Sequence, residues 1–113
     1  MLNKVEGSEL VIGTGRTIKF EGEEHGSGVS FFLVDNEQGQ GPAPHRHPYS
    51  ETWVVLEGEA IVTADGGETP ASIGDILVVE PGTAHQFRAT GEGRLRMMCI
   101  HASPRFHQEN LEA

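Results

Sequence analysis

Short apolar segments separated by turn residues run along most of the chain. β-branched and aromatic residues gather in these segments, and Gly, Pro, Asp or Asn stand between them. The segments start about 8–12 residues apart, which is typical of an all-β sandwich or barrel. A tight-turn signal at residues 57–59 predicts that the strands on either side of it form a hairpin. The predicted strands cover residues 10–12, 17–20, 29–34, 52–56, 60–64, 76–79 and 95–101.

The last strand has a predictable interior face, and one helix is expected after it. Side chains alternate along a strand, so four residues share the face expected to be interior: Leu95, Met97, Cys99 and His101. Ser103 suits a helix N-cap and Pro104 the first helical position, so we expect a short C-terminal helix over residues 104–112. Because the predicted strands are apolar on both faces, we expect two sheets, or a barrel with one outer face covered by a partner chain.

Length, charge and cysteine content narrow the class of protein. A chain of 113 residues suits one domain spanning residues 1–113. Lys and Arg number 8 against 17 Asp and Glu, a net charge of −9, so binding to nucleic-acid phosphates, which needs clustered basic residues, is not expected. The longest apolar runs hold four residues, far short of the about 20 that span a membrane. A lone cysteine, Cys99, and the lack of an apolar leader predict a cytoplasmic protein without membrane association.

The most informative polar residues lie in two glycine-framed segments. His45 and His47 are two positions apart, so on an extended strand both imidazoles lie on one face, about 6.5 Å apart at the backbone. A short turn can return Glu51 to the same point, and a Gly/Pro turn delivers His85 to the start of a later strand. A His-x-His pair alone is more often solvated, but three imidazoles and a carboxylate together suit a divalent Fe, Mn, Ni, Cu or Zn ion.

The same residues resemble the two sequence motifs of the cupin superfamily. The first motif is a Gly, five residues, His-x-His, three or four residues, Glu, six residues and Gly, and each position is met by Gly39, His45, His47, Glu51 and Gly58. The second is a Gly, five residues, Pro-x-Gly, two residues, His, three residues and Asn, matched by Gly74, Gly82 and His85. Glu80 stands at the motif's proline and Ala89 at its asparagine, two positions that are not usually metal ligands in the family.

The resemblance covers residues 28–102, and the chain is similar to small single-domain bacterial cupins. It implies a double-stranded β-helix, that is, a jelly-roll barrel, with a metal ion in its interior. The ligands that it implies are His45, His47, Glu51 and His85. It also implies a homodimer, for which the apolar residues 10–12 offer a contact. Glu80 is expected at the surface, with the barrel mouth as the alternative.

Strand phase selects candidates for the wall of a small-molecule pocket beside the ion. If Glu51 and His85 face inward, the expected wall residues are Trp53, Phe87, Met97 and His101. For the first three, plain core packing explains the pattern equally well. For His101, the alternatives are a partner of the metal site, a substrate-binding base, and a strand-end histidine bonded to backbone.

Two functions of different classes fit this site. The first is a divalent-metal-dependent enzyme, dioxygenase- or isomerase-like, that acts on a small oxygenated organic molecule held at open metal positions. The second is a metal-assisted module that binds or senses a small molecule without converting it. A purely structural metal site is a weaker third. The fold hosts many chemistries and does not choose between them.

Overall fold

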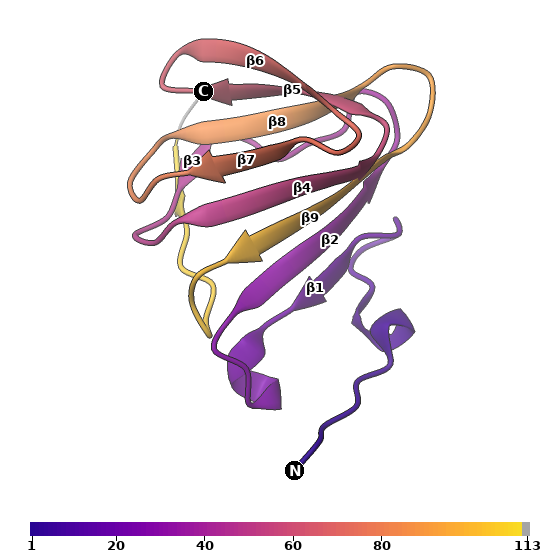
Figure 1. Cartoon of the computed structure of the whole chain (residues 1–113), viewed down its shortest axis with the longest axis vertical. Helices are drawn as coiled ribbons and strands as arrows, with labels where there is room; N and C mark the ends of the chain where they lie inside the picture. The colour runs from indigo at the N-terminus through magenta and orange to yellow at the C-terminus, as the bar shows by residue number, and fades with distance from the viewer. Residues whose placement is uncertain (112–113) are drawn as a thin grey trace.

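The computed structural model describes residues 1–111 and consists mainly of two five-stranded antiparallel sheets (Figure 1). The 3-10 helices η1 (Gly7–Leu10) and η2 (Gly22–His25) flank the first strand. The first sheet has the order β1 (Ile18–Phe20), β2 (Ser30–Asn36), β9 (Leu95–His101), β4 (Glu51–Glu57) and β7 (Ile76–Val79). The second has the order β10 (Glu109–Asn110), β3 (His45–Arg46), β8 (His85–Thr90), β5 (Glu59–Ala64) and β6 (Gly67–Ser72).

Alternate side chains of both sheets fill the interior of this jelly-roll barrel. The alternation predicted for β9 is confirmed, because all four inward positions are buried and the three between them are only partly buried. Strands β4 and β8 follow the same rule. Both begin with a buried polar residue, Glu51 and His85, and continue with buried apolar ones, whereas β9 ends on the buried His101. The strand ends therefore gather polar groups at one end of an otherwise apolar interior.

The predicted hairpin around residues 57–59 is wrong. Strand β4 pairs with β7 and β9, whereas β5 pairs with β6 and β8, so the turn carries the chain from one sheet to the other. Gly58 makes this crossing possible: its φ is +83°, and a Cβ there would collide with the carbonyl oxygen of Arg94. The true hairpin follows, with Asp65 and Gly66 both at positive φ between β5 and β6.

The predicted C-terminal helix over residues 104–112 is also wrong as far as residue 111; residue 112 lies outside the described residues. The segment bends at residues 102–105, has no regular structure over 106–108, and ends in β10, which pairs with β3. Its backbone forms hydrogen bonds with distant parts of the chain. The Leu111 N–H donates to the Pro44 carbonyl at 2.9 Å, and the Pro104 carbonyl accepts from the Glu23 N–H at 2.8 Å. Bonds to the barrel thus replace the local bonds of a helix. Residues 10–12 likewise form no strand, only a single bridge between Val11 and Ile18.

Candidate metal centre

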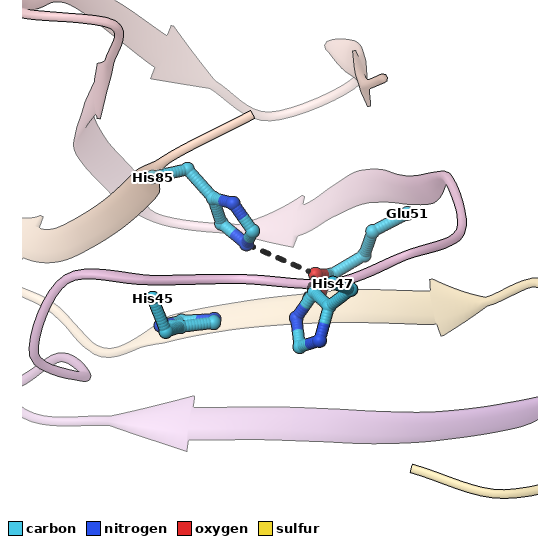
Figure 2. Close-up of side chains that lie close together, drawn as sticks. All are labelled: His45, His47, Glu51 and His85. Atoms are coloured by element: carbon cyan, nitrogen blue, oxygen red, sulfur yellow. Dashed lines mark hydrogen bonds and ion pairs between the residues drawn. The ribbon is translucent and has the colours of Figure 1, made fainter. Parts of the chain in front are cut away.

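The four predicted ligands come from three strands whose ends meet. His45 lies on β3, directly opposite His85 at the start of β8. His47 is the first residue after β3. Glu51 starts β4 in the other sheet, opposite His101. Figure 2 shows the side chains of both sheets directed into one space.

Within this space the donor atoms are close together and shielded from water. Each of the four residues offers a ligand atom, and these atoms all lie within 4.8 Å of one another. The Oε1 atom of Glu51 is 3.2 Å from Nε2 of both His47 and His85. The four residues are 2–6% exposed, so little of their polar surface is open to water. A cluster of buried carboxylate and imidazole is costly to bury unless it is paired or holds an ion.

Each of the three imidazoles is oriented by a hydrogen bond from its Nδ1 atom to a backbone carbonyl. A carbonyl oxygen only accepts hydrogen bonds, so each Nδ1 that contacts one carries a proton. In the neutral ring, Nε2 is then the nitrogen with the lone pair that a metal ion would take. Metal-bound histidines in proteins are typically held this way by their second nitrogen. The pairs are His45 with Ala43 at 2.8 Å, His47 with His107 at 2.7 Å, and His85 with Thr83 at 2.8 Å.

The second carboxylate oxygen of Glu51 is already occupied by protein donors. Trp53 Nε1 donates to Oε2 at 2.6 Å, and His101 Nε2 lies 3.2 Å from the same oxygen. Nδ1 of His101 accepts from the Tyr49 hydroxyl at 2.7 Å. His101 therefore has the opposite tautomer to the other three histidines and bonds to side chains rather than backbone. These two donors leave Oε1 facing the ligand histidines.

Burial and hydrogen bonding set the charge of the cluster. Burial raises the pKa of the Glu51 carboxyl, but hydrogen bonds with the surrounding histidines lower it by more. The pKa therefore lies well below its usual range. Burial lowers the pKa of His45. Burial also lowers the pKa of His85, but the contacts with Glu51 and the Thr83 carbonyl raise it more. Burial keeps Cys99 a neutral thiol by raising its pKa well above the usual value.

The donor set fits a divalent transition metal. Nε2 of His47 is buried and has no hydrogen-bond partner, although Oε1 of Glu51 lies 3.2 Å away. A cation between these groups would satisfy both. Two ligands bonded at about 2.1 Å to one ion lie about 3.0 Å apart at a right angle and about 3.4 Å apart at a tetrahedral angle, and the observed 3.2 Å falls between.

A cavity of about 640 Å³ reaches the cluster from one side. His45 and Glu51 line it, whereas His47 and His85 do not. Of the four predicted wall residues, Phe87 and His101 line this cavity, but Trp53 and Met97 are fully buried outside it. Trp53 instead donates to Glu51. The sequence indicates this contact, because Trp53 lies two residues after Glu51 on the same face of the strand. No sequence pattern near Tyr49 indicates its hydrogen bond with His101. Glu80 is exposed, as predicted.

Two packed antiparallel sheets with three histidines and a glutamate at one end define a metal-binding jelly-roll barrel. The Cupin domain family model matches residues 32–101, and the chain belongs to the cupin family. It is 37% identical over 67 residues to the polyketide synthase CurC of Streptomyces cyaneus, covering 58% of this chain and 43% of that protein. The chain spans about half the length of the curated relatives it matches. No described helix is long and apolar enough to cross a membrane.

Solved structures share this fold. An uncharacterized conserved protein with a double-stranded β-helix domain from Klebsiella pneumoniae superposes with a TM-score of 0.77 at 24% identity, covering 100% of both chains. An oxalate oxidase in complex with the substrate analogue glycolate superposes with a TM-score of 0.79 at 20% identity, covering 96% of this chain and 63% of that one. At such identities the likeness establishes the fold alone.

Proposed function

We propose that this cupin is a divalent-metal-dependent enzyme, dioxygenase- or isomerase-like, that acts on a small oxygenated organic molecule. The proposed ligands are His45, His47, Glu51 and His85, and Fe, Mn, Ni, Cu and Zn are the candidate ions. The observation that supports this most is the converging set of buried donor atoms, with each imidazole tied to a carbonyl behind it. When bound, the ion supplies Lewis-acid or redox chemistry.

The protein's own residues select the side of substrate entry. Because the cavity touches His45 and Glu51 but neither of the other ligands, a substrate reaches the centre past these two side chains. Phe32, Val34 and Phe87 give the cavity an apolar wall. The amide side chains of Asn36, Gln40 and Gln108 also line it. This mixture of apolar walls and a few polar groups suits a small organic molecule that carries oxygen atoms.

Elemental analysis tests the metal site. The protein is purified without chelator and without a metal-affinity tag, beside the His47→Ala and His85→Ala variants. We expect close to one equivalent of a transition metal in the parent chain and a large loss in both variants. Equal metal content in all three proteins would contradict the assignment of the ligands.

A second function, metal-assisted binding or sensing without turnover, is supported by His101. Both of its ring nitrogens are engaged, by Tyr49 and by Glu51, so it is not a free base beside the cavity. Oxygen uptake and product analysis over a broad panel of small oxygenated molecules separate the two functions. Turnover by the metal-loaded protein supports the enzyme. A molecule that binds tightly and is recovered unchanged supports the binding module.

We further propose a cytoplasmic homodimer in which residues 1–113 act as one domain. The single cysteine, Cys99, is buried and unpaired, which suits a reducing compartment. Ile76 and Val78 of the edge strand β7 are 67% and 63% exposed, and Val11 and Ile12 are each 42% exposed. Such exposed apolar side chains favour contact with a second copy. Light scattering at micromolar concentration should give twice the monomer mass, and a monomer would contradict this proposal.

A further inference from the structure

The C-terminal strap, defined as residues 103–111, closes over the same end of the barrel as the metal centre. It leaves β9, turns back along the barrel and forms β10 beside β3 (Figure 1, yellow). Phe106 packs on the rings of Phe32 and His101, with centroids 4.7 and 4.9 Å away. Two exposed ion pairs add contacts, Arg46 with Glu109 and Arg105 with Glu23.

One residue of this strap, His107, contacts the surroundings of the metal centre with both of its backbone polar groups. The carbonyl oxygen of His107 accepts from Nδ1 of His47 at 2.7 Å. The N–H of His107 donates to the hydroxyl of Tyr49 at 3.2 Å. Because that hydroxyl accepts from the strap, its own proton is available for Nδ1 of His101, which in turn contacts Glu51. The backbone of one residue is thus connected to two of the four proposed ligands.

The ring nitrogens behind the other two ligands have partners outside the strap, although the backbone of His45 pairs with Asn110 of β10. His45 and His85 each donate to a carbonyl two residues earlier in the chain, those of Ala43 and Thr83. These contacts survive wherever the local turns survive. His47, by contrast, depends on a carbonyl 60 positions away. Movement of the strap therefore disturbs the hydrogen bond at Nδ1 of His47 and the hydrogen bonds behind Glu51. The Nδ1 contacts of His45 and His85 do not involve the strap.

We propose that the C-terminal strap is a positioning element of the metal centre, acting through the His107 backbone and the Tyr49 side chain. This inference rests on the proposed metal site. Because coupling between two equilibria is reciprocal, metal binding stabilises the docked strap as much as the docked strap strengthens metal binding. Partners that orient metal ligands in this way typically change metal affinity by about 10–100-fold.

Two substitutions in the 113-residue chain separate the contribution of the His107 backbone from that of the His107 side chain. Tyr49→Phe keeps the ring that stacks on His47 but removes the hydroxyl. The Kd for Co²⁺, measured by competition with a chelator, should rise about 10-fold. His107→Ala keeps the peptide N–H and C=O, and its Kd should stay within about twofold of the parent value. An unchanged Kd for Tyr49→Phe, or a large loss for His107→Ala, would overturn the proposal.

Hydrogen exchange of the unaltered protein provides a test that needs no variant. Amide exchange of residues 103–111, followed by mass spectrometry, should slow when Co²⁺ is added. Residues 67–72, on the β6 edge away from the strap, serve as an internal reference. If Co²⁺ binds and the strap exchanges at the same rate with and without it, the strap proposal fails and the metal site stands. If Co²⁺ does not bind at all, the proposed function itself fails.

Discussion

The two ends of the barrel interior share strands β4 and β9 but hold opposite chemistry. At one end Val55 and Leu95 pack in an apolar core, 1% and 0% exposed. At the other end, equally buried, lie three imidazoles turned toward the carboxylate of Glu51. Apolar packing satisfies the first end by itself, whereas the polar end is satisfied only in part by the protein. Burial stabilises the apolar end, but at the polar end a buried nitrogen without a partner costs free energy until another group binds it.

The largest expected effect comes from removing the charge at the polar end. Glu51→Gln keeps the size of the side chain and an oxygen for Trp53, but it removes the negative charge. The Kd for a divalent transition metal should rise more than about 100-fold, because losing a ligand costs more than losing a residue that only orients one. Glu57→Gln, at the exposed end of the same strand, is the matched control and should bind as the parent does. Isothermal titration of both variants makes the comparison, and equal affinities would contradict the role of Glu51.

A substitution at the apolar end should have the opposite profile. Met97→Ala opens a cavity at a fully buried position, so the free energy of unfolding should fall by about 2–5 kcal/mol. Metal stoichiometry in the folded protein should not change. Met98→Ala, one position along and on the outer face of β9, should cost less. Urea unfolding and metal analysis of both variants would reveal whether the two ends are as separate as proposed.

Trp53 joins the two ends, and its substitution should affect both modestly. Trp53→Phe fills much of the apolar space but removes the N–H that donates to Glu51 Oε2 at 2.6 Å. Metal affinity should fall about 10-fold, with a loss of about 1 kcal/mol in the free energy of unfolding. Titration calorimetry and urea unfolding measure the two effects. A loss of stability with unchanged affinity would mean that the indole serves packing only.

The smallest effect is expected at Glu80, where the second cupin motif has proline. This side chain is exposed and takes no part in the cluster. Glu80→Ala should change the free energy of unfolding by less than about 0.5 kcal/mol, and metal content should match the parent. Reduced metal content in this variant would place the residue at the mouth of the barrel after all.

The strand pattern of the interior could be predicted because it follows local rules. Alternation placed Met97 and Phe87 on inward faces, and both are buried. The spacing of the histidines and Glu51 likewise identified residues that the fold brings together. Strand β6 was not predicted, because its sequence is polar, contains Pro70 and has one buried residue. A strand at the sheet edge needs no apolar face, so it leaves little pattern to read.

The errors share one physical cause, which is that long-range contacts override local signals. Residues 57–59 make a sharp turn as predicted, but a turn signal does not say which sheet the next strand joins. Ser103 and Pro104 favour a helix start, yet the segment after them gains its hydrogen bonds from β3 and from the centre. The roles of Tyr49 and of the His107 backbone depend on contacts across more than 50 positions. No local pattern carries that information.

An anomalous difference map from a crystal of the Co²⁺-loaded protein tests the central claim most directly. The account predicts one strong peak inside the barrel, within bonding distance of His45, His47, Glu51 and His85, with His101 bonded to Glu51 rather than to the ion. An empty cluster, with Co²⁺ bound only at surface histidines, would contradict it.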